Sequence, residues 1–137
     1  MKLSKNFTLE ELIYSETAKN YGIKNEPDEN VVYNLKKLCE NVLQPIRDKF
    51  GVVIVTSGYR CSKLNKKIGG KETSQHLYGQ AADIQLKNAD LKEVFYFIKN
   101  NLVFDQLLLE YSKNSKWIHV SYTTLRNRKY SNDKYIV

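Results

Sequence analysis

The stretch Ser74-Gln75-His76-Leu77-Tyr78-Gly79-Gln80-Ala81-Ala82-Asp83 decides the fold, because it leads from a loop into a β-strand predicted over 81–86. Side chains of a strand point alternately to its two faces. Asp83 is therefore predicted to lie on the face opposite Ile84 and Leu86, among small neighbours. A carboxylate in such apolar surroundings needs a hydrogen-bonding partner or a cation. The strand is thus predicted to have one core face and one face that carries a site.

Another histidine lies in the middle of a second predicted strand, Trp117-Ile118-His119-Val120-Ser121-Tyr122, and the only other histidine of the chain is His76. Two histidines and one aspartate, Asp83, would supply three ligands to zinc and leave the fourth position for water, as in catalytic zinc sites. A histidine in a strand is more often a hydrogen-bonded residue without a metal. The spacing alone leaves both interpretations open.

The rest of the sequence indicates an α+β fold in which helices pack against a mainly antiparallel sheet. The β-branched run Val52–Thr56 predicts a strand that is buried on both faces or lies at the centre of the sheet. Pro45 falls inside a long helical pattern and is expected to kink or break that helix. In chain order, the predicted elements are a helix from the capping box Thr8–Glu11 to about Thr17, a helix from about Asn30 to Gly51, the strand 52–56, one or two helical turns at 62–68, the strand 81–86, a helix capped by Asn88 or Asp90, and strands at 104–111 and 116–123.

The last two predicted strands form a hairpin with the loop Ser112–Ser115. With this four-residue loop, Glu110 is diagonal to His119 and lies on the same face of the sheet. A loop one residue longer would turn every side chain over and would bring Asp105 to that face instead. Glu110 is preferred as the acidic neighbour of His119 because it lies nearer along the hairpin, and Asp105 is the alternative.

Length and composition are typical of one globular domain over residues 1–137, with 42% hydrophobic and 27% charged residues. No window approaches the roughly 20 apolar residues of a membrane-spanning helix. No apolar segment follows the basic N-terminus, so no signal peptide is predicted and synthesis in the cytoplasm is expected. Cys39 and Cys61 lack the spacing of a zinc finger and are expected to be free thiols, buried or half-buried.

The net charge of +7 comes from 22 Lys and Arg against 15 Asp and Glu. These cations are spread along the chain and form no cluster with exposed aromatic residues, so a nucleic-acid partner is not expected. Attraction to another anionic polymer would explain the charge. Arg126, Arg128 and Lys129 add positive charge near the end of the chain, where a solvated tail is expected.

Three motifs follow one another in the chain: Ser57-Gly58-Tyr59-Arg60, the SxHxxGxAxD element from Ser74 to Asp83, and Trp117–Tyr122. In order and separation they resemble the motifs of the zinc D-alanyl-D-alanine carboxypeptidase family. That family includes phage-type L-alanyl-D-glutamate endolysins and shares its core with the hedgehog signalling domain. The resemblance covers roughly residues 7 to 130. It implies a hedgehog-like fold and cleavage of peptidoglycan stem peptides with one zinc ion.

The resemblance also implies roles for individual residues. His76, Asp83 and His119 match the zinc ligands of the family. Arg60 matches the arginine that holds a substrate carboxylate or polarises the scissile carbonyl. Ser74 matches a serine that lines the same pocket.

Further expectations concern the cleft and the setting of the protein. Tyr59 and Trp117 are candidate aromatic walls of the substrate cleft. The protein is expected to act as a monomer at the bacterial cell wall, and a phage or prophage lysin released by a separate pore is one possible origin. The sequence does not distinguish a D,D-carboxypeptidase from an L-alanyl-D-glutamate endopeptidase.

One position departs from much of the family, in which an acidic residue three positions before the last histidine is the general base. Lys116 occupies that position here, and a lysine cannot replace a carboxylate at neutral pH without a large pKa shift. Glu110, or Asp105 in the other register, is therefore the candidate base. The alternative is a zinc-containing binding module for cell wall or protein that does not hydrolyse peptides.

Overall fold

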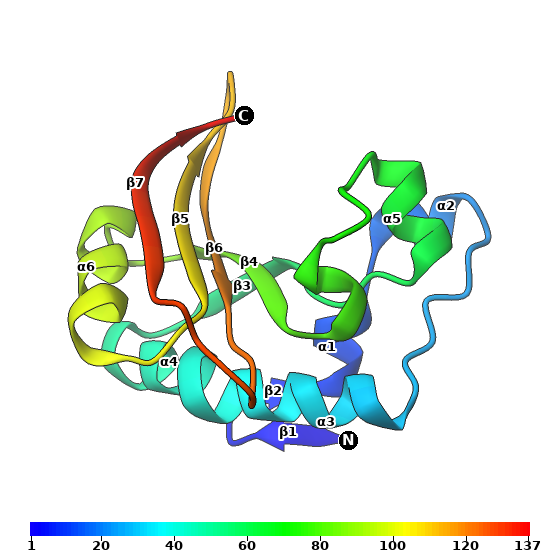
Figure 1. Cartoon of the computed structure of the whole chain (residues 1–137), viewed down its shortest axis with the longest axis horizontal. Helices are drawn as coiled ribbons and strands as arrows, with labels where there is room; N and C mark the ends of the chain where they lie inside the picture. Colours follow the sequence, from blue (N-terminus) through cyan, green and yellow to red (C-terminus); the bar gives the residue numbers. More distant parts are fainter.

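Five strands form one curved sheet in the order β3-β4-β6-β5-β7, and α6 packs against one side of it (Figure 1). The computed structural model describes all 137 residues. Neighbouring strands are antiparallel except β5 and β7, which are parallel. The strands are β3 (Val53–Ser57), β4 (Ala81–Leu86), β5 (Gln106–Tyr111), β6 (Lys116–Ser121) and β7 (Tyr130–Ile136). The predicted α+β class with a mainly antiparallel sheet is confirmed.

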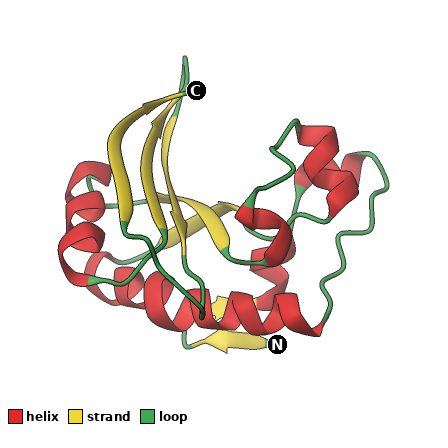
Figure 2. Cartoon of the chain, viewed as in Figure 1, coloured by secondary structure: helices red, strands yellow, loops and turns green.

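Helices make up much of the chain outside this sheet (Figure 2). A small sheet of two strands, β1 (Lys2–Ser4) and β2 (Phe7–Thr8), precedes them. The helices are α1 (Leu9–Ile13), α2 (Glu16–Asn20), α3 (Glu29–Leu38), the π-helical turn η1 (Cys39–Leu43), α4 (Gln44–Phe50), α5 (Ser62–Ile68), the 3-10 helix η2 (Gln75–Tyr78) and α6 (Leu91–Asn101). None of them has the length and apolar character that a membrane crossing requires.

The core lies between the helices and one face of the sheet. Ile84 of β4 and Ile118 of β6 oppose each other in register and are fully buried. They belong to one hydrophobic cluster with Phe95 of α6, Leu38 of α3 and Ile46 of α4. Burying each of these side chains contributes about 1.5–3 kcal/mol. Successive side chains of a strand point to opposite faces, so the residues next to Ile84 and Ile118 in β4 and β6 lie on the other face of the sheet. The candidate site lies on that face.

The hairpin of β5 and β6 has the predicted four-residue loop. Glu110 pairs with Trp117, and Leu108 pairs with His119. The predicted register is therefore confirmed, and so is the predicted extent of β4. Asp90 caps α6 through a hydrogen bond from the backbone N–H of Glu93, which decides between the two predicted caps.

Pro45 marks the predicted break in the long helix. The chain forms a π-helical turn over Cys39–Leu43, and Pro45 lies in the first turn of α4. The backbone N–H of Gln44 reaches back five residues to the carbonyl of Cys39. Proline lacks the N–H that a continuous helix needs, so a wider turn precedes it.

Two predicted elements are wrong in detail. The helix expected to continue to Thr17 ends at Ile13, because Tyr14 is extended and the Ser15 side chain accepts the N–H of Ala18 to begin a second helix. The strand after Val52 is neither central nor buried on both faces. It lies at the edge of the sheet, and the side chain of Ile54 is 43% exposed.

The tail expected around Arg126, Arg128 and Lys129 is exposed, but the chain does not end there: a further strand, β7, follows it. β7 runs parallel to β5 at the edge of the sheet, and the backbone N–H of Tyr130 donates to the carbonyl of Asp105. Its sequence, Tyr-Ser-Asn-Asp-Lys-Tyr-Ile, has little apolar alternation, so no strand was predicted there. The free edge of β5 supplies the backbone hydrogen bonds that hold it.

Candidate metal centre and its cavity

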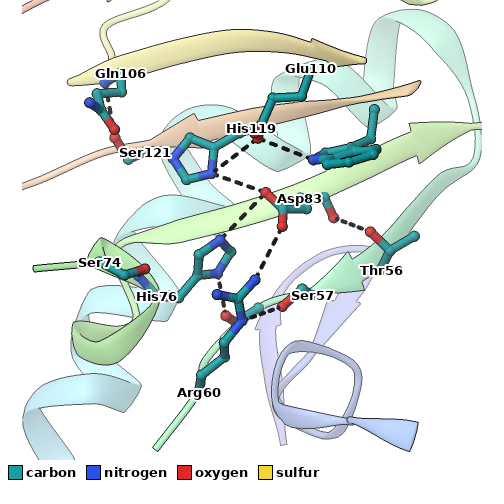
Figure 3. A network of polar contacts seen from close by, with 12 residues as sticks. Thr56, Ser57, Arg60, Ser74, His76, Asp83, Gln106, Glu110, His119 and Ser121 are labelled. Carbon is teal, nitrogen blue, oxygen red and sulfur yellow. Dashed lines mark hydrogen bonds and ion pairs between the residues drawn. The ribbon is translucent and has the colours of Figure 1, made fainter. Parts of the chain in front are cut away.

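Three side chains from different elements meet on the polar face of the sheet (Figure 3). Asp83 of β4 and His119 of β6 are directly opposed in the strand register, and His76 comes from η2. The Asp83 Oδ1 atom lies 3.0 Å from His119 Nδ1 and 3.4 Å from His76 Nε2. The structure thus brings together the three residues that the sequence analysis selected as metal ligands.

Local hydrogen bonds orient His76. The Ser74 hydroxyl accepts the backbone N–H of His76 and begins η2, which ends at Gly79 with φ +71°. The His76 ring donates from Nδ1 to the carbonyl of Gly58 at 2.7 Å. A carbonyl only accepts, so Nδ1 carries the proton and the lone pair of Nε2 faces Asp83. A Cβ on Gly58 would lie 2.1 Å from the carbonyl oxygen of Leu12, so only glycine permits this close approach.

Burial and mutual contacts perturb the titration of this cluster. Burial lowers the pKa of His76 and favours its neutral form, which is the form that binds metals. Burial acts to raise the pKa of Asp83, but the hydrogen bond from His119 and the close approach of the His76 ring outweigh it and hold that pKa well below its usual range. The site thus combines neutral His76 with an ionised carboxylate.

Arg60 contacts the cluster from the segment that follows β3. Its Nη2 atom donates to Asp83 Oδ2 at 3.4 Å, and its Nε atom donates to the Ser57 hydroxyl at 3.0 Å. Burial lowers its pKa against the opposing effect of Asp83. Asn65, which lies outside the sequence motifs, accepts a hydrogen bond from Arg60 Nη1 at 3.2 Å. A single asparagine inside a short helix carries no local signal of such a role.

Glu110 lies on the same face, as the predicted register requires. Its Oε2 atom accepts a hydrogen bond from Trp117 Nε1 at 3.1 Å and lies 4.0 Å from His119 Nδ1. Burial and the nearby charge of Asp83 raise the pKa of Glu110. Lys116 is exposed and, by alternation along β6, belongs to the opposite face from His119. Lys116 therefore does not point into the site, and Glu110 is the acidic residue beside His119.

Asp105, the alternative acid, is 4% exposed and fully engaged elsewhere. It accepts hydrogen bonds from the backbone N–H, Nε and Nη2 of Arg128 at 2.8–2.9 Å and from Nε2 of Gln75 at 2.9 Å. The hydrogen bond from Arg128 lowers the pKa of Asp105 to about 2. The Asp105 carboxylate therefore links the segment before β7 to η2 and does not face His119.

A cavity of about 530 Å³ opens beside the cluster. Glu110 and His119 line it from the sheet, and Ser74 lines it from the loop before η2. Residues that the sequence analysis did not select complete the lining: Lys71, Thr73, Gln75, Gln106, Leu108, Arg128, Tyr130 and Tyr135. Two of them belong to β7, so the unpredicted strand forms one wall of this cavity.

The two aromatic residues expected to form the cleft walls lie outside the cavity lining. Tyr59 is buried in the hydrophobic core, and its backbone N–H donates to the carbonyl of Leu12. The assignment of Tyr59 to the substrate is therefore corrected to a packing role. Trp117 is half-buried and uses its indole N–H to hold Glu110.

The donors of the cluster fit a zinc ion. Bonds of about 2.1 Å in a tetrahedron place neighbouring donor atoms about 3.4 Å apart. The ligand atoms of His76 and His119 lie 3.4 and 3.0 Å from Asp83 Oδ1, and all three lie within 4.8 Å of one another. Three protein donors would leave one position of a bound zinc ion free, as in catalytic zinc sites.

Most of the sequence matches a known family. A family model described as Peptidase M15 matches residues 5–121, which include the complete ligand cluster, Arg60 and Glu110. The chain is an M15 peptidase. Its family supports zinc-dependent peptidase activity, and its His76-Asp83-His119 group is able to hold the metal. None of the curated proteins compared with this M15 peptidase matches it.

Proposed function

We propose that this M15 peptidase hydrolyses peptide bonds in peptidoglycan stem peptides, with Glu110 as the general base. One observation carries the proposal: the Glu110 carboxylate lies on the face of the candidate ligands, 4.0 Å from His119, and lines the same cavity. His76, Asp83 and His119 would hold zinc. When bound there, zinc supplies Lewis acidity to the scissile carbonyl and lowers the pKa of water toward about 7.

The side chains of the chain divide the remaining tasks. Glu110 takes a proton from the attacking water at its carboxylate and delivers it to the leaving amine. Trp117 holds Glu110 by one hydrogen bond and leaves its other oxygen free to face the cavity. Because both histidines of the chain belong to the ligand cluster, no imidazole is left to act as the base.

Arg60 supports the same reaction from the other side of Asp83. Its guanidinium keeps N–H groups that none of its three partners uses. A guanidinium close to the oxygen that becomes negative stabilises that charge. The role in catalysis is thus compatible with the hydrogen bonds that Arg60 already makes.

The substrate class is supported by the charge of the protein and its cavity. Stem peptides carry free carboxylates, and Lys71 lines the cavity without an ion-pair partner. The net charge of +7 would concentrate the protein at an anionic cell wall at low salt. We also propose that the protein acts as a monomer.

The test is to incubate the zinc-loaded protein with a panel of defined stem peptides and to follow the products. Release of free D-alanine would identify a D,D-carboxypeptidase, whereas a new amino terminus on D-glutamate would identify an L-alanyl-D-glutamate endopeptidase. A chelated sample and His119→Ala are the controls and should cleave nothing. Absence of cleavage across the panel despite bound zinc would contradict the peptidase proposal and favour the binding module.

A further inference from the structure

Asn65 is a buried polar residue that connects two parts of the site. Its side chain is 4% exposed and lies on α5, outside the three motifs that define the family resemblance. Oδ1 accepts from Arg60 Nη1 at 3.2 Å, and Nδ2 donates to the carbonyl of Lys71 at 2.9 Å. Arginine only donates and a carbonyl only accepts, so these two partners determine the orientation of the amide.

The Arg60 guanidinium has a separate partner for each of its nitrogens. Nε donates to Ser57, Nη1 donates to Asn65 and Nη2 donates to Asp83. Three partners around a planar group determine both its position and its tilt. The contact with Asp83 is the longest of the three at 3.4 Å, so Ser57 and Asn65 decide where Arg60 meets the carboxylate.

The loop after α5 packs directly on this amide. The backbone N–H groups of Gly69 and Gly70 both donate to the backbone carbonyl of Asn65, at 3.1 and 2.9 Å. A Cβ on Gly70 would lie 2.1 Å from Asn65 Oδ1 and 3.1 Å from Arg60 Nη1. The next residue, Lys71, lines the cavity. One asparagine therefore contacts both the arginine behind Asp83 and the backbone of the cavity wall.

We propose that Asn65 is a positioning residue for the metal centre: it holds Arg60 in the orientation in which Arg60 presents Asp83 to the metal. Asp83 uses Oδ1 for both histidines and Oδ2 for Arg60. Without a held guanidinium, the carboxylate is free to rotate away from the histidines. The proposal rests on the metal site of the proposed function and is independent of the substrate.

Zinc affinity is the decisive measurement, because partners that orient a ligand typically change metal affinity by about 10- to 100-fold. It is measured by chelator competition with the metal alone on the wild type, Asn65→Ala, Arg60→Ala and the double variant. Asn65→Ala is expected to weaken zinc binding about tenfold, and the double variant is expected to match Arg60→Ala. That equality follows only if Asn65 acts through Arg60.

A matched control separates positioning from general stability. Gln44 is a half-buried amide with several side-chain partners, among them Ser4 and Asp48, and it lies far along the chain from the metal cluster. Gln44→Ala should lower the melting temperature and leave zinc affinity unchanged. Unchanged zinc affinity in Asn65→Ala, or losses that add up in the double variant, would overturn the proposal.

Asn65→Asp is a milder second variant, which tests the same role if Asn65→Ala does not fold. The carboxylate retains an acceptor for Arg60 and loses the donor to Lys71, so zinc affinity should stay close to that of the wild type. An equal loss in Asn65→Asp and Asn65→Ala would show that the Lys71 contact matters instead and would refute the role through Arg60. A wild type that binds zinc but cleaves no stem peptide would contradict only the proposed function.

Discussion

Two arginine–aspartate pairs flank the candidate metal centre, and their carboxylates differ in how completely they are occupied. Asp105 accepts four hydrogen bonds, three of them from Arg128 at 2.8–2.9 Å. Asp83 receives a single 3.4 Å contact from Arg60 and turns its other oxygen to the two histidines. A carboxylate saturated by arginine and amide donors holds the chain together, whereas one whose oxygen faces two histidines is available to share a metal with them.

The largest expected effect follows from exchanging the two aspartates for asparagine in turn. Asp83→Asn should lose both hydrolysis and zinc binding, with affinity falling by more than about 100-fold, beyond what partners outside the ligand set contribute. His76→Ala and His119→Ala should do the same. Asp105→Asn should keep its zinc. Isothermal titration with zinc measures the affinity of all four variants. Full metal retention in Asp83→Asn would contradict the assignment of Asp83 as a metal ligand.

Glu110 is a third carboxylate to compare. It accepts one hydrogen bond, from Trp117, and lines the cavity. Glu110→Gln preserves the shape and the contact with Trp117 but removes the proton acceptor. Turnover of a cleavable stem peptide should fall by about 10²- to 10⁴-fold while zinc stays bound. Asp105→Asn is the matched control, and retained hydrolysis in Glu110→Gln would move the role of base to another group.

The Asp105–Arg128 pair should affect stability rather than metal binding. Asp105→Asn weakens the link between the segment before β7 and η2, and the free energy of unfolding should fall by about 1–2 kcal/mol, since Arg128 is half exposed and its charge is screened. Urea unfolding measures this difference. Arg128→Lys, which keeps the charge but loses the bidentate geometry, should fall between the wild type and Asp105→Asn. If Asp105→Asn changed zinc affinity more than stability, the Asp105–Arg128 pair would not be a purely structural pair.

The smallest effect is the pH dependence of that same pair. The folded pKa of Asp105 is lowered from 3.8 to about 2, so the ionised form stabilises the fold. Its contribution is complete above about pH 4 and is lost as the pH falls through about 2. The difference in unfolding free energy between wild type and Asp105→Asn should therefore shrink over this range. A difference that stays constant down to pH 2 would contradict the pairing.

Prediction from the sequence worked where local chemistry determines structure. The alternation in β4 separates Asp83 from the core residues, the four-residue loop sets the register that brings Glu110 to the face of His119, and Pro45 breaks the long helix. Each follows from neighbours close in sequence. The β-branched run Val52–Thr56 wrongly predicted a central or doubly buried strand, because β propensity indicates a strand but not its place in the sheet.

The sequence alone determined the residue types of the candidate site and the faces of three of them: Asp83, Glu110 and His119 lie on strands of known alternation, and His76 lies in the segment before β4. Only the tertiary structure decided which acid faces the cavity, that β7 forms one of its walls, and that Asn65 holds Arg60. These depend on contacts between segments far apart in the chain. Such contacts form when the fold buries polar groups that must then find partners, and no local pattern records which partners they find.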